Sequence, residues 1–188
     1  GTIWLALLVN PLTSVLGAVS LVSYLFIYTP LKRLTWLNTA MGAIPGALPP
    51  LMGWAAARGE LAGGGWVLFA ILALWQLPHF FAIAWIYQEE YAKAGFKMLP
   101  SVDPDGSRTA HQSVNHTMLL LPVSLCPFLF HLAGTFYLAG AMILGVGYLW
   151  CAIRFAKRLD GKSAKQLFLA SILYLPLLLI LLVVDKTR

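Results

Sequence analysis

Long apolar segments are the feature that most restricts what this chain can fold into. They run for about 17–23 residues, the length that an α-helix needs to cross about 30 Å of hydrocarbon. A transmembrane strand would instead show about ten residues of strict alternation, and no segment does. Hydrophobic residues make up 60% of the 188 residues and charged residues 11%, whereas a soluble domain is about 25% charged. The sequence therefore predicts an all-α, polytopic transmembrane helix bundle.

The spacing of the apolar segments predicts six full spans after an N-terminal remnant. Short connections between them are typical of antiparallel neighbouring helices. The chain begins at Gly1 in the middle of an apolar segment, without Met or a basic region, so we expect the N-terminus to have been removed. The predicted segments are Thr2–Val9 (the remnant), Leu12–Tyr28, Trp36–Ala57, Gly65–Tyr87, Thr117–Ala133, Tyr137–Ile153 and Gln166–Val184.

The basic residues predict the orientation of these spans. When the spans alternate across a membrane, ten basic residues fall on one side, and Arg58, Lys186 and Arg188 fall on the other. Cytoplasmic loops carry an excess of Lys and Arg, so the larger group is expected in the cytoplasm. This topology accounts for the net charge of +6, and no nucleic-acid partner is expected. The larger group contains Lys32, Arg33, Lys93, Lys97, Arg108, Arg154, Lys157, Arg158, Lys162 and Lys165.

The connection 88–116 is the longest between predicted spans, and it carries four of the seven acidic residues. The basic-residue bias places it on the cytoplasmic side. We therefore predict one transmembrane domain over residues 1–188, with 88–116 as its cytoplasmic active-site loop.

Prolines and glycines predict a cavity between two neighbouring helices. Pro45, Pro49 and Pro50 interrupt the backbone hydrogen bonds of one predicted span, and Pro78 interrupts those of the next. In a membrane such interruptions are tolerated against protein or a water-filled cavity. In the same region, the GxxxG spacing 42–46 would let a neighbouring helix approach closely.

The segment YTPLKRLT (28–35) is a candidate diphosphate site. Lys32 and Arg33 lie together at a predicted cytoplasmic helix end, between the hydroxyl groups of Thr29 and Thr35. Point charges beside directional donors suit a diphosphate. The alternative is that the pair reflects only the ordinary excess of positive charge on the cytoplasmic side.

The pair Glu89–Glu90, flanked by Tyr87 and Tyr91, is a candidate Mg²⁺ site at the end of another span. Carboxylates can hold Mg²⁺ that bridges phosphate oxygens. Adjacent helical residues point about 100° apart, so Glu90 is the better ligand and Glu89 the weaker one. The alternative is that both are solvated acids at a helix end.

His79, in the segment WQLPHFF (75–81), lies inside an apolar span directly after Pro78. An ionisable residue within a membrane is a functional candidate by default. It could ligate haem iron, act as a base, or hydrogen-bond a carbonyl that Pro78 leaves free. These candidate groups all fall on one side of the membrane around adjacent helices.

These segments together resemble a known family. YTPLKRLT, GAIPGALPPLMGW, WQLPHFFAIAW and EEYAKAGFKMLP, in this order, are similar to the protoheme IX farnesyltransferases, a branch of the UbiA-type intramembrane prenyltransferases. The similarity runs from about Asn10 to Pro100. It implies a helix bundle around a central cavity whose reactive end faces the bacterial cytoplasm.

The resemblance also implies a reaction. A farnesyl group would pass from farnesyl diphosphate to a vinyl group of haem B, and water would add, giving haem O. Haem A synthase would be a candidate partner. Lys32, Arg33 and Glu90 would be catalytic, and Mg²⁺ would be held by Glu89 and Glu90. The residues expected to contact substrate are Tyr28, Thr29, Thr35, His79, Tyr91 and Lys97.

Two departures from the family pattern bear on this prediction. The first acidic motif of the family, of the type Asn-x-x-x-Asp-x-x-x-Asp, is not present in these 188 residues. We therefore expect that about two N-terminal helices are missing and that this piece alone is inactive. In addition, Gln88-Glu89-Glu90 replaces the spaced aspartates of relatives that prenylate phenols, which favours the haem branch.

Two alternatives remain at this stage. A polyprenyltransferase could act on an aromatic acceptor such as 4-hydroxybenzoate, although AGFKMLP and WQLPH argue against it. A transporter could use the interrupted helices as a binding site. Transporters usually show paired interruptions in two related halves, whereas here the interruptions cluster in one region.

Overall fold

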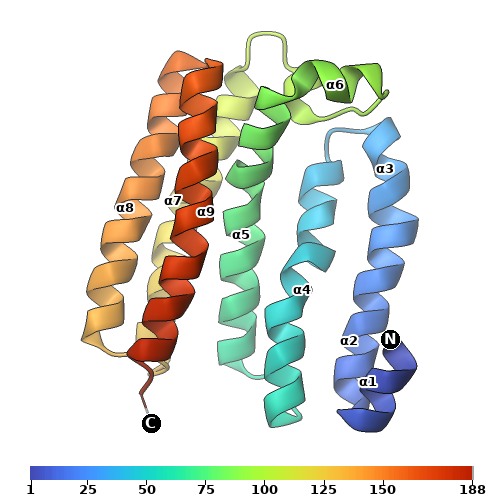
Figure 1. The fold of residues 1–188 in the computed structure, drawn as a ribbon, viewed down its shortest axis with the longest axis vertical. Helices are drawn as coiled ribbons and strands as arrows, with labels where there is room; N and C mark the ends of the chain where they lie inside the picture. Colours follow the sequence, from blue (N-terminus) through green and yellow to red (C-terminus); the bar gives the residue numbers. More distant parts are fainter. Residues whose placement is uncertain (188) are drawn as a thin grey trace.

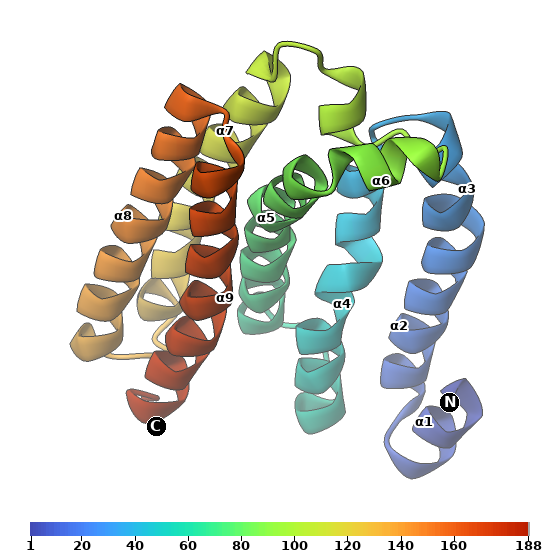
Figure 2. The ribbon, with the colours of Figure 1, turned by 45° about the horizontal axis from the view of Figure 1, so that its top comes forward.

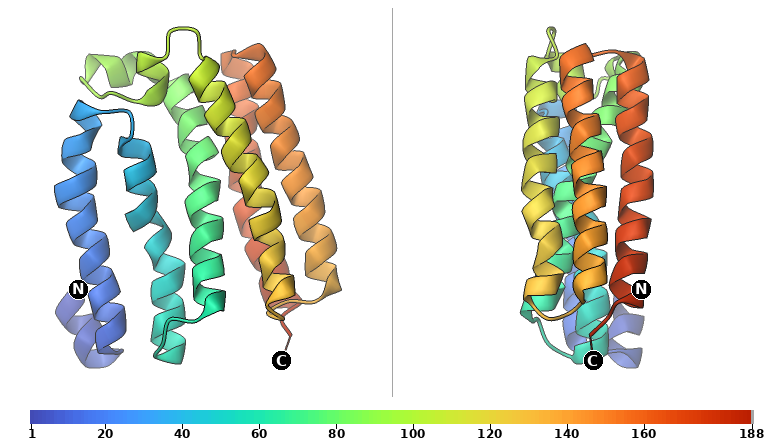
Figure 3. Two further views of the ribbon diagram at one scale, coloured as in Figure 1. Left: turned by 180° about the vertical axis from the view of Figure 1, so that it is seen from behind. Right: turned by 90° about the vertical axis from the view of Figure 1, so that its left-hand side faces the viewer.

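The computed structural model describes residues 1–187 as helices that run up and down around a common direction (Figure 1). Consecutive long helices are antiparallel neighbours, and an edge-on view shows how close their axes are to parallel (Figure 3). The elements are α1 (Thr2–Leu8), α2 (Pro11–Val22), the π-helical η1 (Ser23–Tyr28), α3 (Thr29–Leu34), α4 (Asn38–Arg58), α5 (Gly63–Ile86), α6 (Gln88–Lys93), the 3-10 turn η2 (Leu99–Val102), α7 (Ser107–Leu129), α8 (Thr135–Arg158) and α9 (Gly161–Val184).

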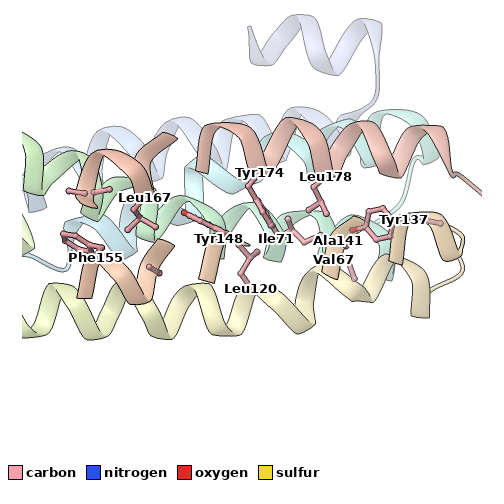
Figure 4. Close-up of a cluster of buried hydrophobic side chains, with 14 residues drawn as sticks. Val67, Ile71, Leu120, Tyr137, Ala141, Tyr148, Phe155, Leu167, Tyr174 and Leu178 are labelled. Carbon is pink, nitrogen blue, oxygen red and sulfur yellow. The ribbon is translucent and has the colours of Figure 1, made fainter. Parts of the chain in front are cut away.

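Helices α5, α7, α8 and α9 form a four-helix bundle that contains the largest apolar core. Tyr148, Tyr174, Phe155 and Leu167 are buried between these helices (Figure 4). Polar side chains form hydrogen bonds between helices inside this core. The hydroxyl of Tyr174, for example, lies 2.5 Å from Ser124 Oγ. Hydrogen bonds of this kind between helices satisfy polar groups that lipid could not.

Helix α4 joins this bundle to the N-terminal helices, because it packs on α5 and on α2 with η1. Leu16 of α2 meets Leu48 and Leu51 of α4 in a second small core. The side chain of Asn10 caps α2 by accepting a hydrogen bond from the Thr13 amide at 2.8 Å. Its amide nitrogen donates to the Ala55 carbonyl of α4 at 2.9 Å, so the cap also fixes α2 against α4.

The π-helical segment η1 lies between α2 and α3, directly before Pro30. Pro30 has no N–H for the carbonyl four residues earlier, and its ring would clash with that carbonyl in a regular helix. The wider turn removes the clash, and Thr29 Oγ1 donates to the Tyr24 carbonyl at 2.9 Å. A π turn takes about one extra residue, which rotates the following side chains by roughly 100°.

Helix α6 and the segment after it lie across one end of the helices, over α3, α4 and α5 (Figure 2). The Lys97 amide donates to the Lys32 carbonyl of α3 at 2.8 Å. The Lys97 carbonyl accepts from the Asn38 side chain of α4 at 2.9 Å. The backbone of Lys97 therefore attaches α6 and residues 96–98, called the ceiling below, to the end of α3 and the start of α4.

The fold class predicted from the sequence is confirmed, but several helix boundaries differ from the prediction, most of all the start of α7. Helix α7 begins at Ser107, ten residues before the predicted Thr117, so residues 107–116 of the predicted loop 88–116 are helical. The prediction failed because this first part of α7 is polar. The Asp103 carboxylate stabilises the first turn of the helix, because it accepts hydrogen bonds from the amide and the hydroxyl of Thr109 at 2.7 and 2.8 Å. Nearby, hydrogen bonds from Ser107 lower the pKa of the exposed Asp105 carboxyl.

The chain is an integral membrane protein. Four helices, 11–34, 63–86, 135–158 and 161–184, are long and apolar enough to cross a bilayer. Many of their large side chains are exposed, as lipid-facing residues are; Phe26, Ile143 and Val183 are examples. Helices α4 and α7 are of similar length but fall outside this group, because α4 is rich in glycine and proline and α7 begins with polar residues.

Asp185 fastens the end of α9 to the start of α8. Its carboxylate accepts from the Tyr137 amide at 2.7 Å, and its carbonyl accepts from the Gly134 amide at 2.9 Å. We expect Asp185→Ala to destabilise the protein by about 1–2 kcal/mol, because a carboxylate at a helix N-terminus satisfies free amides and the dipole. Thermal unfolding in detergent should show a midpoint a few degrees lower. Glu60→Ala, in the exposed loop before α5, is the control, and equal midpoints for both variants would contradict this role.

Candidate functional site

A cavity of about 770 Å³ lies between α2–α3, α4 and α5, under the ceiling formed by α6 and residues 96–98. It lies between the two helices in which the sequence predicted a cavity, and α1, α2 and η1 line its third side. The lining residues are Gly1, Thr2, Leu5, Gly17, Ser20, Leu21, Tyr24, Tyr28, Lys32, Thr39, Gly42, Pro45, Gly46, Met52, Gln76, Phe80, Ile83, Tyr91, Phe96 and Met98.

Gly42 and Gly46 line this cavity, and each makes room for one side chain. A Cβ on Gly42 would lie 2.7 Å from the Tyr28 ring, and a Cβ on Gly46 would collide with Gln76 Oε1. The GxxxG spacing was expected to let a neighbouring helix approach. It instead admits an aromatic ring and an amide, one helical turn apart, at the cavity wall.

Lys32 lies at the upper end of the cavity among aromatic rings. Its Nζ is 4.4 Å from the ring centre of Tyr28 and 5.9 Å from those of Tyr24 and Phe96. Cation–π attraction at such distances holds the ammonium in place without an acidic partner. In the described part of the chain no carboxylate forms an ion pair with Lys32. The ammonium is therefore available to an anion that enters the cavity.

The structure separates the residues of YTPLKRLT that the sequence grouped together. Tyr28 and Lys32 line the cavity, whereas Arg33 is exposed and outside it. The Thr29 hydroxyl is used within the helix by the Tyr24 carbonyl. The Thr35 hydroxyl accepts from the Leu37 amide at 3.3 Å, where it shapes the turn before α4.

The predicted residues after α5 are also divided. Tyr91 lines the cavity, and its ring centre is 6.3 Å from that of Phe96. Lys97 contributes backbone hydrogen bonds while its side chain is exposed. Glu89 and Glu90 lie exposed in the first turn of α6. Across residues 1–187 no group of three or more His, Cys, Asp or Glu side chains that could hold a metal ion occurs.

His79 faces α9 instead of the cavity. Its Nδ1 lies 2.7 Å from Ser171 Oγ, and its ring lies 4.9 Å from Trp75 and 5.1 Å from Phe168. The α5 residues that line the cavity are Gln76, Phe80 and Ile83. A partner on α9 thus satisfies the polar group of His79 within the helix bundle.

Gln76, Tyr24 and Phe96 also line the cavity and were not predicted from the sequence. Gln76 carried a usable signal, since it is an amide inside an apolar span. The two aromatic residues carried none, because aromatic side chains occur throughout membrane helices.

The shape and lining of this cavity are accompanied by sequence similarity over almost the whole chain. A model of the UbiA prenyltransferase family matches residues 1–178. The chain belongs to the UbiA prenyltransferase family.

Relatives within the UbiA family include proteins named protoheme IX farnesyltransferase. That of Solibacter usitatus is 50% identical over 98% of this chain and 62% of its own length. That of Salinibacter ruber is 50% identical over 86% of this chain and 57% of its own length. That of Koribacter versatilis is 45% identical over 100% of this chain and 63% of its own length. The chain thus spans about three fifths of the curated relatives that it matches.

A solved structure supports the UbiA fold. The structure of a digeranylgeranylglyceryl phosphate synthase in membranes superposes with a TM-score of 0.80, over 98% of this chain and 64% of that chain. The two sequences are 18% identical, so this likeness concerns the fold alone.

The two adjacent basic residues should differ in anion binding. We expect Lys32→Met, in the full-length gene product, to weaken the affinity for inorganic diphosphate by on the order of tenfold or more, because a charge-assisted contact in the cavity is lost. Arg33→Met should change it much less, because Arg33 lies outside. Calorimetric titration in detergent measures both. Equal losses would contradict the placement of Lys32 as the anion-binding group.

Proposed function

We propose that the full-length protein transfers the farnesyl group of farnesyl diphosphate to a vinyl group of haem B, giving haem O for the assembly of a terminal oxidase. The observation that carries this proposal is identity of up to 50% with protoheme IX farnesyltransferases over nearly the whole chain. An apolar cavity with one ammonium group at its upper end supports it. The activity is proposed for the whole protein, because this chain spans only part of its relatives.

The cavity suits both ends of the prenyl donor. Lys32 would bind the diphosphate, and Arg33 at the same helix end would add to the positive potential around it. The aromatic and aliphatic wall below Lys32 would take the farnesyl chain. Tyr28 and Tyr91 would contact the substrates near the diphosphate, and Thr29, Thr35 and Lys97 would support the helix ends and the ceiling around it. We assign no substrate contact in this cavity to His79.

The reaction breaks the bond between farnesyl C1 and the diphosphate oxygen, and the diphosphate leaves with the electron pair. The electron pair of the haem vinyl group forms the new carbon–carbon bond, which leaves the inner vinyl carbon cationic until water adds. Lys32 would stabilise the departing negative charge. The apolar wall strengthens this electrostatic effect, because it keeps bulk water away from the charges.

Mg²⁺ is part of the proposal, with Glu90 as the main protein ligand and Glu89 as a weaker one. Mg²⁺ commonly takes one or two carboxylates together with substrate phosphates. Both carboxylates are exposed on α6 in the cavity ceiling, which is compatible with this mode. When bound, the ion would neutralise part of the diphosphate charge.

We infer a location in the bacterial cytoplasmic membrane, with the ceiling on the cytoplasmic side. Lys32, Arg33, Lys97, Lys157 and Arg158 are among the basic residues at this end, which the positive-inside rule assigns to the cytoplasm. Haem A synthase, which would use the product, is the proposed partner in the bilayer.

An aromatic acceptor such as 4-hydroxybenzoate is the second candidate, since the same cavity could bind another planar ring. Transport of a solute is the third candidate, and the identity with protoheme IX farnesyltransferases weighs against it.

The first test identifies the product. The full-length gene is expressed in a bacterium that lacks its own haem O synthase, and the membrane haem is analysed by liquid chromatography with mass spectrometry. We expect a haem that is heavier by one farnesyl group and one hydroxyl group. Unmodified haem B, from a protein shown to be folded in the membrane, would refute the haem assignment. Prenylation of 4-hydroxybenzoate or flux of a solute would then be measured instead.

A second test concerns the glutamates. We expect Glu90→Gln to raise the Mg²⁺ concentration needed for half-maximal activity by on the order of tenfold, because a charged ligand is replaced by a neutral one. Glu89→Gln should have a smaller effect, since the adjacent side chain points about 100° away. The measurement is turnover of detergent-solubilised enzyme across a Mg²⁺ titration. Unchanged Mg²⁺ dependence in both variants would remove the glutamates from the metal site.

A further inference from the structure

Gln76 is a buried polar residue on the cavity wall, and it has no role in the proposed reaction so far. It lies in the middle of α5 and is 4% exposed. Its Nε2 donates to the Ala43 carbonyl of α4 at 2.8 Å. Because this bond fixes the nitrogen end of the amide, the orientation of the oxygen end follows from the hydrogen-bond network.

The other end of this amide, Oε1, has no donor. No side chain or amide of the described residues donates to it, and it is not among the fully buried atoms that lack a partner. It lies against Gly46, and both residues line the cavity, so a molecule in the cavity can reach it. The nearby hydroxyls of Ser20 and Thr39 are already committed as donors, to the Pro45 carbonyl and to Asn38 Oδ1. Within the described residues, this oxygen is therefore free to accept a hydrogen bond from a molecule in the cavity.

This oxygen lies close to the group that would hold the diphosphate. The Tyr28 ring rests against Gly42 and the Gln76 oxygen against Gly46, and these glycines are one helical turn apart, about 6 Å along α4. Lys32 Nζ is 4.4 Å from the Tyr28 ring centre. The Gln76 oxygen thus lies about one helical turn along α4 from the ring that the ammonium contacts. In the proposed scheme the reacting carbons follow the diphosphate along the same wall.

We propose that Gln76 positions the water molecule that adds to the haem side chain. Its Oε1 accepts a hydrogen bond from this water, which directs an oxygen lone pair at the cationic inner vinyl carbon. The water oxygen bonds to that carbon, and the proton it loses passes to the released diphosphate. This inference rests on the proposed function. In this proposal, Gln76 favours hydration of the cation over the competing reaction, in which the cation loses a proton and gives an unhydrated diene.

The apolar wall is what makes this placement necessary. A cation in a cavity that excludes bulk water must meet a water held at a defined position, or it loses a proton instead. An amide oxygen can hold such a water by one hydrogen bond without itself becoming charged.

The test measures how the product divides between the two outcomes. Gln76→Leu is introduced into the full-length gene in the strain lacking haem O synthase, and hydrated and unhydrated farnesyl haem are separated by mass. We expect the ratio of hydrated to unhydrated product to fall by on the order of tenfold, the effect of losing one orienting hydrogen bond. Gln76→Glu retains an acceptor oxygen and should keep the product mainly hydrated.

A second variant covers the case in which Gln76→Leu does not accumulate in the membrane. Gly46→Ala leaves the amide present but adds a methyl group that collides with Oε1, so the oxygen must move. We expect the same shift toward the unhydrated product. Gln166→Leu, the same chemical change on α9, is the matched control and should give the wild-type ratio.

The outcomes separate this inference from the proposed function. Wild-type ratios in both Gln76→Leu and Gly46→Ala would overturn the role of Gln76. Folded variants that make no farnesylated haem would also overturn it, because Gln76 would then act before the hydration step. A wild-type protein that makes no farnesylated haem refutes the proposed function itself, and this inference with it.

Discussion

The side chain of Asn38 holds together the parts of the molecule on which the cavity depends. It is fully buried at the start of α4. Its nitrogen donates to the Thr35 carbonyl at 2.7 Å and to the Lys97 carbonyl at 2.9 Å, while its oxygen accepts from the Thr39 hydroxyl at 3.2 Å. One amide thus joins the turn after α3, the first turn of α4 and the ceiling. Together with the hydrogen bond from the Lys97 amide to the Lys32 carbonyl, it connects the wall of the cavity to its cover.

The two halves of the fold have different tasks. The bundle of α5, α7, α8 and α9 is a closed core with buried tyrosines and short cross-links. The half built from α2, η1, α3 and α4 packs less completely and leaves the cavity. The π turn of η1 sets the rotation of Tyr28 and Lys32 about the helix axis. Gly42 and Gly46 of α4 leave room for the side chains that line the cavity wall.

Charge and apolar surface are divided along the cavity in a way that suits the proposed prenyl transfer. A single ammonium is held by aromatic rings at the upper end, and the wall below is mostly apolar, with the Gln76 amide set into it. Electrostatic stabilisation of a leaving group is strongest in such a low-dielectric environment.

The sequence by itself determined the membrane helices, their order and the region of the site. Apolar length and basic-residue bias are local properties that survive folding, and the segments around Lys32 and Glu90 did fall at one end of the structure. The tertiary structure decided which members of each motif meet. It placed Lys32 in the cavity and Arg33 outside, turned His79 toward Ser171, used Gly42 and Gly46 for side chains instead of a helix contact, and began α7 at Ser107. The physical reason is that the direction of a side chain depends on helix rotation and on neighbouring helices, and a π turn before a proline changes that rotation without leaving a periodic signal in the sequence.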